Sequence, residues 1–488
     1  MSCPFDEARY RVLLEGLEIT ELRLSAVRAH NAKLRVDSGY FAKPMLAAER
    51  LVRGYAGGYD ELGSLFSRFA KGVFDMSAES YSDRGVPFLR ILNLRNGVID
   101  DADLALIPEA LHEAERKTEL RRGDIVLSKT AYPAASLVTL DRCNTSQDTI
   151  ATSLSDYGRT TYAPEVIVAF LNSDVGSQLL LRQFQGNVQL HLSLDDGRKV
   201  PMPRFGCALQ HIVARAFACA DRQSIESKGQ MQAAEQLVRQ GLGLDRVGEL
   251  EPVAYTRTSR DAFDAGRLDA EHFKPKYVEL LRSIEATGCC TQLGTVLVAN
   301  QRGKQPEYAE SEGGSPVVNS KHVADGTVRL DGANRCATAG DGALLIKRGD
   351  VVMNGTGVGT IGRAAPYLHD APALPDNHVT VLRPAPDAID PVYLAVYLNS
   401  RAGQMQVEQR SRGSSGQIEL YPSDIAEFSI WLAPTEVQAE VRAAVEASFA
   451  ARRRAAALLG AAKRAVEIAI EDSEPSALAW LADALRLP

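Results

Sequence analysis

The sequence predicts an α+β fold that contains two tandem, related domains and two long antiparallel helices. Three observations predict it. A unit of about 230 residues occurs twice, which is the size of a whole domain. Strand-like and helix-like patterns do not alternate regularly, as they would in a doubly wound sheet. A long helix-favouring segment closes each copy. Together these features describe a pseudo-twofold internal repeat.

The duplication is visible in residues that keep their order at a nearly fixed offset. Arg35, Asp37 and Phe41 recur as Arg267, Asp269 and Phe273. Further matches are Leu62-Gly63 with Leu293-Gly294, Lys71-Gly72 with Arg302-Gly303, Pro87 with Pro316, Gly97 with Gly326, Arg122-Gly123-Asp124 with Arg348-Gly349-Asp350, and Leu171-Asn172-Ser173 with Leu398-Asn399-Ser400. Chance similarity would not keep this order, and the repeat is too long for a solenoid unit. We therefore infer two copies of one domain.

Each copy has the same predicted internal plan. A helical lead-in precedes short strand-like runs, and a buried strand and an apolar helix follow them. The segments are, in chain order, the lead-ins 40–53 and 273–285, the hairpin-type dipeptides Asn96-Gly97 and Asp325-Gly326, the Gly-Asp strands from Gly123 and Gly349, and the helix starts at Pro164 and Pro391. Two similar modules are therefore expected.

The closing helices are expected from about 208 to 240 and from about 435 to 471. Their apolar and small positions step by three and four residues, as in a heptad seam, and alanine dominates the second helix. Alanine permits close approach of two helices, so we expect the pair to lie antiparallel and to hold the two domains apart. The alternative is that each helix packs on its own domain.

Composition limits the class of protein. The chain has 488 residues, a net charge of −7 and no apolar run long enough to span a membrane. Its first residues are acidic rather than typical of a signal peptide. The seven scattered cysteines and eight dispersed histidines predict a reducing cytoplasm and no structural zinc. The acidic total argues against a protein that binds DNA alone by bulk attraction, although a basic cleft can lie on an acidic body.

The motifs that resemble catalytic sites do not satisfy the chemistry they would need. Residues 357–362 fit Gly-x-Gly-x-x-Gly, but Arg363-Ala364-Ala365-Pro366 follows where a phosphate cradle requires a helix. Asp390-Pro391-Val392-Tyr393 is expected to be a helix start rather than a methyltransferase site. We find no Ser/His/Asp grouping and no metal-binding histidine spacing, so the sequence predicts a non-catalytic protein.

Basic and amide side chains gather instead in the loops that differ between the copies. Lys and Arg contact phosphates, and Arg, Asn and Gln can bind base edges. The predicted DNA-binding residues of copy one are Lys71, Arg90, Asn93, Arg95, Lys129, Gln189 and His191, and those of copy two are Arg302, Lys304, Asn319, Lys321, His322, Arg363, Arg410, Arg412 and Gln417. Any one of them could be a solvated surface residue. At matched loop positions of two copies, the set indicates a polar recognition face.

With these features the chain resembles the DNA-specificity (S) subunit of type I restriction-modification systems. The resemblance is carried by the duplicated Leu-Gly and its polar glycine loop, the Gly-Asp strand, the Leu-Asn-Ser helix, and the stretch from Gly413 to Pro434 that leads into Glu436-Val437-Gln438 and a long helix. Copy one has only Pro201-Met202-Pro203-Arg204-Phe205 before its helix. It also lacks the glycine-rich turn that follows the Gly-Asp strand in copy two.

The resemblance implies a division of the chain and a set of partners. The implied parts are target recognition domain 1 (1–205), spacer helix 1 (206–241), a linker (242–266), target recognition domain 2 (267–434), spacer helix 2 (435–472) and a C-terminal tail (473–488). Each domain would bind one half of a split, asymmetric DNA site. Two methyltransferase subunits would clasp the helices, and motor-nuclease subunits would join them. This subunit would hold no cofactor, since S-adenosylmethionine would bind the methyltransferase and ATP and Mg the motor.

Two other functions remain open at this point. The chain could be a two-domain scaffold of a defence complex in which one recognition domain has degenerated, an idea that the divergence of copy one supports. It could also be a nucleic-acid-modifying enzyme in its own right, although the absent cofactor loop and acidic cluster count against this.

Overall fold

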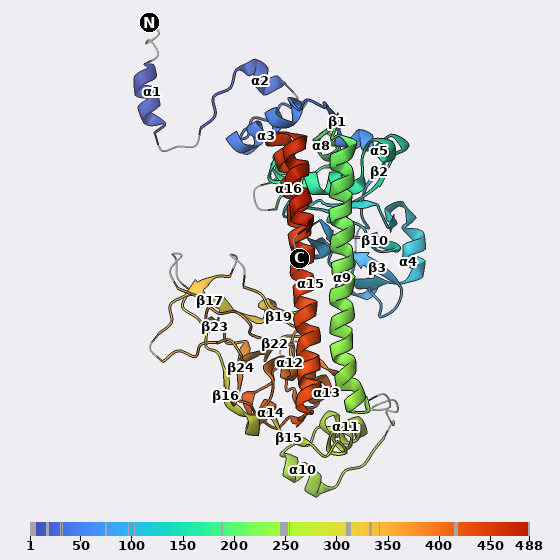
Figure 1. The fold of residues 1–488 in the computed structure, drawn as a ribbon, viewed down its shortest axis with the longest axis vertical. Helices are drawn as coiled ribbons and strands as arrows, with labels where there is room; N and C mark the ends of the chain where they lie inside the picture. Colours follow the sequence, from blue (N-terminus) through green and yellow to red (C-terminus); the bar gives the residue numbers. More distant parts are fainter. Residues whose placement is uncertain are drawn as a thin grey trace. The chain divides into compact units, whose positions relative to one another are not determined.

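The computed structural model describes residues 6–15, 19–29, 31, 33–73, 76–95, 97–101, 103–186, 189–244, 252, 254–308, 314–330, 334–340, 342–413 and 418–486. The chain divides into two compact units. Unit 1 comprises Met1–Ser224 and Arg453–Pro488, and unit 2 comprises Ile225–Arg452. Both contain helices and sheets (Figure 1), so the predicted mixture of α and β structure is confirmed. Within the described ranges, no helix has the length and apolar character needed to cross a lipid bilayer.

Two larger sheets form the body of unit 1, with strand orders β2-β11-β8-β9-β5-β4 and β6-β3-β10-β7. Their bounds are β2 (Phe66–Lys71), β3 (Val86–Leu89), β4 (Leu94–Arg95), β5 (Val98–Ile99), β6 (Ala105–Ile107), β7 (Leu120–Arg121), β8 (Ile125–Ser128), β9 (Ala135–Leu137), β10 (Arg142–Thr145) and β11 (Thr149–Leu154). Two short pairs accompany them, β1 (Tyr59–Glu61) with β14 (Pro201–Pro203) and β12 (Phe184–Gln185) with β13 (His191–Leu192).

The helices of unit 1 that precede the first long helix are α1 (Glu7–Leu13), α2 (Leu24–Arg28), α3 (Lys43–Arg53), α4 (Glu109–Ala114), α5 (Asp156–Thr161), α6 (Pro164–Leu171), α7 (Asp174–Gln183) and α8 (Leu194–Gly197). Helix α6 begins at the predicted Pro164 and buries every side chain from Val166 to Leu171. A helix that is apolar on all sides must be covered on all sides, and α6 contacts β9 and α7.

Unit 2 repeats this plan with fewer strands. Its sheets have the orders β16-β24-β21-β22 and β20-β17-β23, with the pairs β15-β25 and β18-β19. The strands are β15 (Cys290–Gln292), β16 (Leu297–Arg302), β17 (Ser315–Val318), β18 (Val323–Ala324), β19 (Thr327–Val328), β20 (Cys336–Ala337), β21 (Val351–Asn354), β22 (Ala364–Pro366), β23 (Leu374–Pro375), β24 (Val379–Pro384) and β25 (Ser429–Trp431). The helices are α10 (Ser259–Ala265), α11 (Pro275–Glu285), α12 (Pro391–Asn399), α13 (Arg401–Arg410) and α14 (Pro422–Ala426).

The Leu-Asn-Ser motif has the same function in both units. Asn172 accepts from the Ala135 N–H (3.1 Å) and donates to the Ala135 carbonyl (2.7 Å). Asn399 makes the same two bonds to Ala364, at 2.9 and 2.7 Å. Each amide therefore adds two hydrogen bonds to the backbone of the strand that pairs with the Gly-Asp strand, β9 or β22, and joins that strand to the end of the apolar helix.

Two pairs of glycines are required by the shared backbone path. Gly123 and Gly349, which open the Gly-Asp strands, have φ angles of 89° and 93°, in the region that favours glycine. Gly176 and Gly403 lie close to the preceding helix, where a Cβ would overlap the carbonyl oxygen of Phe170 or Leu398. The sequence match at these positions therefore reflects a constraint on conformation and space.

The two long helices are α9 (Cys207–Gly241) and α15 (Thr435–Glu471) (Figure 1). Each unit holds one half of each helix. In unit 1 the core joins Leu209, Val213 and Ala216 of α9 to Ala462, Ala465 and Ala469 of α15. In unit 2 it joins Ala234 and Val238 to Val441 and Val445. The first half of one helix thus meets the second half of the other, so within each unit the two segments run antiparallel.

The helix seam contains one buried polar contact in unit 2. The Ser448 hydroxyl donates to the Ser227 carbonyl (2.7 Å), and the two hydroxyl oxygens are 2.9 Å apart. Both side chains are buried, at 4% and 0% exposure. A satisfied polar pair in an apolar seam fixes register, because sliding the helices would leave the hydroxyls unpaired.

A glutamine joins each long helix to its own module. Gln210 of α9 accepts from the Ala163 N–H (2.7 Å) and donates to the Phe205 carbonyl (2.8 Å). Gln438 of α15 accepts from the Asp390 N–H (2.9 Å) and donates to the Ala433 carbonyl (2.7 Å). The helix entrance that was recognised in the sequence only before α15 therefore exists before α9 as well, without its proline.

Two segments have more structure than the sequence indicated. The range 473–488, expected as a tail, contains α16 (Glu474–Arg486), which buries Ala477 and Leu481 in the core of unit 1. Glu474 accepts from the Tyr55 hydroxyl (2.5 Å) and the Gly206 N–H (2.8 Å). The expected linker 242–266 contains α10, although 245–251 and 253 lie outside the described residues.

We predict that Gln210→Ala and Gln438→Ala each lower the free energy of unfolding by about 2 kcal/mol, because each leaves a backbone N–H without its partner. Urea denaturation measures the loss. The matched control is Gln232→Ala, an exposed position on α9, for which little change is expected. Equal stability of all three variants would contradict a stabilising role for the Gln210 and Gln438 hydrogen bonds.

Candidate nucleic-acid interface

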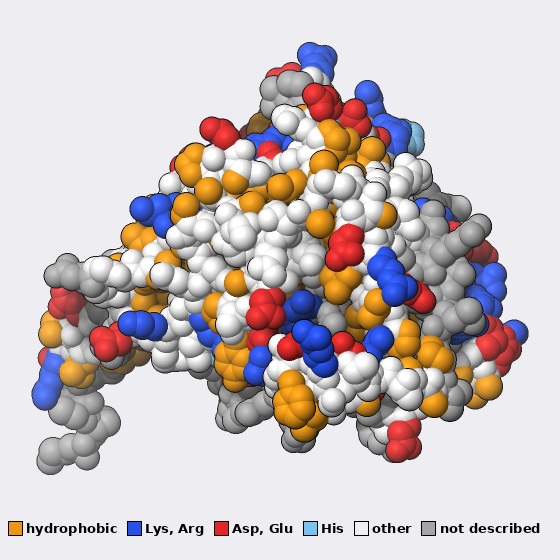
Figure 2. All heavy atoms as spheres, turned by 90° about the horizontal axis from the view of Figure 1, so that it is seen from below, with side chains coloured by type: hydrophobic (Ala, Val, Ile, Leu, Met, Phe, Trp, Pro, Cys, Tyr) orange, Lys and Arg blue, Asp and Glu red, His pale blue; other side chains and the backbone are white. Residues whose placement is uncertain are grey.

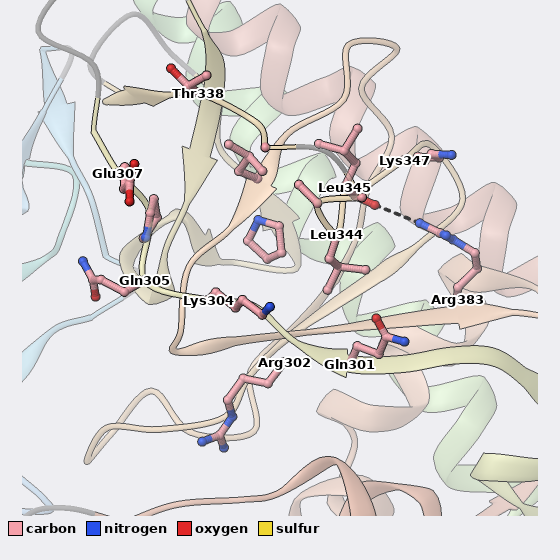
Figure 3. Close-up of a pocket in the computed structure, with 16 residues that line it drawn as sticks. Gln301, Arg302, Lys304, Gln305, Glu307, Thr338, Leu344, Leu345, Lys347 and Arg383 are labelled. Carbon is pink, nitrogen blue, oxygen red and sulfur yellow. Dashed lines mark hydrogen bonds between the residues drawn. The ribbon is translucent and has the colours of Figure 1, made fainter.

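A groove in unit 2 has a volume of about 730 Å³ (Figure 3). It is lined by the end of β16 and the following loop (Gln301 to Glu307), by the segment before β21 (Thr338 to Lys347), and by Leu374, Pro375 and Arg383. The ammonium group of Lys304 lies inside the groove in Figure 3. Lys304 and Lys347 are exposed, and their side chains have no ion-pair partner in the described part of the chain. The groove therefore presents two available cations.

Arg302, the last residue of β16, is already held by contacts within the protein. Its guanidinium points away from Lys304 in Figure 3. It donates to the Leu420 carbonyl (2.6 Å) and the Gly355 carbonyl (3.2 Å), and it lies over the Tyr421 ring. Arg302 therefore ties the turn after β21 to the segment before α14 through its Nη2 group, and its Nη1 lies 3.6 Å from Glu419.

An arginine-aspartate pair lies beside the groove and has a rearranged equivalent in unit 1. Arg383 on β24 makes two bonds to the buried Asp350, at 2.7 and 2.8 Å. In unit 1 the matching aspartate, Asp124, is paired with Arg68 on β2 at 3.4 Å. Arg68 lies opposite Ser153, and Ala299 lies opposite Arg383, in equivalent strand pairs. The arginine has moved across the strand pair while its contact has been kept.

Two predicted contact residues are buried in matching turns. Asn93 is fully buried, accepts from the Arg90 N–H (2.9 Å), and donates to the carbonyls of Asp100 and Asp103. His322 is 8% exposed and accepts from the Asn319 N–H at 3.1 Å. These side chains shape their turns and do not face solvent in this conformation. Arg90 is likewise held by Asp103, 3.3 Å away.

In unit 1 four of the predicted residues come together. Lys71 is the last residue of β2. Burial of Lys129 lowers the pKa of that lysine, and the nearby positive charge of Lys71 lowers it further. The hairpin β12-β13 lies alongside, since Leu192 N–H donates to the Lys129 carbonyl (2.8 Å) and Thr130 bridges His191. Gln189 and His191 are exposed on that hairpin. Lysine, amide and imidazole groups thus form one polar edge in unit 1.

The other predicted residues of unit 2 differ in availability. Burial lowers the pKa of Arg410, which lies over Phe428 and near Glu427. Arg412 is paired with Asp424 at 2.6 Å. Lys321 and Arg363 are exposed, and neither side chain has a partner among the described residues. Gln417 lies outside the described residues. In unit 1, Arg95 is half exposed and 3.7 Å from Asp100.

The turn from Gly357 to Gly362 connects β21 to β22. It does not lead into a helix, and this agrees with the prediction that it is not a phosphate-binding loop. Asp390 caps α12, accepting from the N–H groups of Val392 (2.8 Å) and Tyr393 (2.9 Å), so it is a helix start. Lys347, which lines the groove, was not among the predicted DNA-binding residues. Lys347 precedes the Gly-Asp strand in the basic pair Lys347-Arg348, and that position could have indicated it.

Charges of both signs are interspersed on the surface. Figure 2 shows one face on which Lys and Arg side chains lie next to Asp and Glu side chains. Many loop cations are in such pairs, for example Arg122 with Asp141 and Arg348 with Asp370. Among the described loop residues, the cations without an ion-pair partner include Lys304 and Lys347 at the groove of unit 2, and Lys321 and Arg363 elsewhere in that unit.

No family model matches the chain, and no curated protein matches it. The solved structures that are similar to it include three of type I restriction-modification systems. They are the type I restriction-modification S subunit from M. genitalium (13% identity, 87% of this chain and 95% of that chain, TM-score 0.34) and the HsdS subunit from Thermoanaerobacter tengcongensis (18%, 88% and 97%, TM-score 0.26). The third, from a study of complex assembly and conformational transition in the type I R-M system, is 16% identical over 88% and 97% of the two chains, with a TM-score of 0.26.

We predict that Arg383→Ser lowers the free energy of unfolding by about 3 kcal/mol, because Asp350 is left as a buried unpaired charge. Adding Ala299→Arg should recover much of the loss, since unit 1 places its arginine on that strand. Urea denaturation of both single variants and the double variant measures the recovery. A double variant no more stable than Arg383→Ser would show that the two arrangements are not equivalent.

A second experiment distinguishes residues that would contact DNA, such as Lys304, from buried residues that only hold a turn in shape, such as Asn93. Lys304→Ala is expected to reduce the slope of log K against log salt concentration by about one, at unchanged melting temperature, because one phosphate contact is lost. Asn93→Ala is expected to cost about 2 kcal/mol of stability through its lost buried hydrogen bonds, with the slope unchanged while folded. Fluorescence anisotropy with a duplex DNA, at several salt concentrations, measures both. The opposite pattern would contradict the assignment.

Proposed function

We propose that this chain is the DNA-specificity subunit of a type I restriction-modification complex or of a related defence complex. Each module would bind one half of an asymmetric target made of two short blocks separated by unread bases. The observation that carries the proposal is the contrast between the internal contacts of the modules, which are the same in both, and their loops, which differ. Asn172 and Asn399, or Gln210 and Gln438, make the same contacts in both modules. The solvent-facing residues of the loops differ.

That contrast is what a two-site reader requires. Both modules must present loops to the same kind of ligand from the same scaffold, so the frame is constrained, whereas the sequence read by each module depends on the loop side chains. The groove cations Lys304 and Lys347 have no equivalent lysines in copy one, where Val73 and Arg121 stand at those positions. We therefore propose that the two half-sites differ in sequence.

The long helices would set the distance between the half-sites. Helices of 35 and 37 residues extend about 50 Å at about 1.5 Å per residue, which corresponds to about one and a half turns of DNA. The buried Ser227–Ser448 contact and the hydrogen bonds of Gln210 and Gln438 to their modules would resist sliding and rotation of these helices. A fixed number of unread bases between the two blocks is the expected consequence.

Catalysis would belong to the partners. We propose that two methyltransferase subunits, which bind S-adenosylmethionine, clasp the helices, and that motor-nuclease subunits using ATP and Mg join them. The similar structure described for complex assembly in the type I R-M system supports partners of this kind. With a net charge of −7, the chain alone should bind DNA weakly and in a salt-sensitive way, and tight binding should require the complex.

Exchange of one module tests the proposal. Residues 35–205 are replaced by the corresponding module of another specificity subunit, and methylated adenines are mapped across the genome of cells that express the complex. One half of the methylated motif should change, while the other half and the number of unread bases stay constant. A motif that does not change would support the scaffold alternative for copy one. Absence of any methylated motif with the parent chain would contradict the proposal.

A further inference from the structure

The most exposed large apolar side chains of the described residues lie at the start of the two modules or just before it. Leu268 is 88% exposed, and Val36 and Phe263 are each 81% exposed. Val36 and Leu268 are equivalent, because they stand at the centre of the duplicated Arg-x-Asp motif, Arg35 to Asp37 and Arg267 to Asp269. Isolated surface leucines are common, but the same exposed aliphatic position in two copies is a repeated feature.

The same contacts hold both side chains outward. Arg35 Nε is 2.8 Å from an Asp37 carboxylate oxygen, and its Nη1 donates to the Arg182 carbonyl at 3.0 Å. Arg267 is 2.7 Å from Asp269 and donates to the Arg410 carbonyl at 3.4 Å. The aspartates also accept from the N–H groups of Tyr40 and His272, respectively, at 3.0 and 3.1 Å. Each turn is therefore braced against its own module.

The charges of these turns do not suit a nucleic-acid ligand. Both arginines are about five-sixths buried, at 16% and 17% exposure, and are used internally. Arg35 and Arg267 hold the pKa of the adjacent aspartates below the usual range, so the carboxylates are ionised, and they are half exposed. The turn presents an aliphatic side chain beside a negative charge, which a phosphate backbone would repel.

The segments ahead of the turns also lack a covering surface. Helix α2 has five residues and α10 has seven, and neither buries a residue. Helices this short are marginal in water unless they pack on something. Phe263 of α10 and Leu24 of α2 are 81% and 64% exposed. Each module is thus preceded by a short helix and a braced turn whose apolar side chains face solvent.

We infer that the turns at Val36 and Leu268 are two equivalent docking points for two copies of one partner protein. Features that both modules share serve a ligand common to both, whereas the loops that differ serve specificity. The occupant is a protein with an apolar pocket that receives the aliphatic side chain and a basic group at the rim that meets the aspartate. This rests on the proposed function, which makes the methyltransferase subunit the partner present twice.

The experiment uses the full chain and the methyltransferase subunit produced with it. Native mass spectrometry gives the number of bound subunits, and calorimetric titration gives the dissociation constant of each site. Val36→Asp or Leu268→Asp should weaken one of the two sites about tenfold or more, as expected when a buried apolar anchor becomes a charge. The double variant should weaken both.

The matched control is Val298→Asp. Val298 is 63% exposed on β16, and its counterpart in copy one is the polar Ser67, so no loss of affinity is expected. Two subunits bound to the double variant with parental affinity would overturn the inference and leave the proposed function intact. If the parent chain binds no methyltransferase subunit, the proposed function fails and the inference with it. A parent chain that self-associates through these turns would identify a second copy as the occupant and overturn the inference.

Discussion

The attachment of each long helix to its module depends on one side-chain amide. Gln210 and Gln438 bond the backbone of a helix start (Ala163 or Asp390) and of the short link between the last strand and the long helix (Phe205 or Ala433). An amide that bonds in two directions fixes both the position and the rotation of the helix against the module. Unpaired buried amide groups are costly, so this attachment is rigid, and both the core seam and the loop positions follow from it.

Divergence between the copies follows physical rules. Contacts made by backbone, by glycine or by a fully used amide are kept. One charged contact is kept in pairing but not in position, as Arg68 and Arg383 reach equivalent aspartates from neighbouring strands. Asn93 and His322 differ in chemistry yet accept from the same backbone position. A contact that only requires an acceptor tolerates a change of residue type, whereas a Cβ at Gly176 or Gly403 would overlap a carbonyl oxygen and is not tolerated.

The sequence was sufficient for features that depend on local order or on the repeat. The helices were expected at about 208–240 and 435–471 and extend from Cys207 to Gly241 and from Thr435 to Glu471. The Gly-Asp strands and the helix start at Pro391 were also predictable. The role of Gln210 was not predictable in the same way, because copy one has Gly206 where Pro434 precedes Gln438. The burial of Asn93 and the pairing of Arg412 depend on residues distant in space, which spacing along the chain does not reveal.

The pairing of loop arginines also explains how an acidic chain could recognise DNA. The sequence has 55 Lys and Arg against 62 Asp and Glu, and arginines such as Arg302 and Arg410 are used within the fold. Among the described loop residues, Lys304 and Arg363 remain available to phosphates. Sequence-independent attraction scales with the number of phosphates neutralised, so each arginine that is paired within the fold lowers it. A larger share of discrimination would then come from the loops, and the remaining affinity from the basic surfaces of partner subunits. Under the proposed function, low non-specific affinity would let the subunit leave non-target DNA easily, which would be an advantage if its partners modify or cut what it binds.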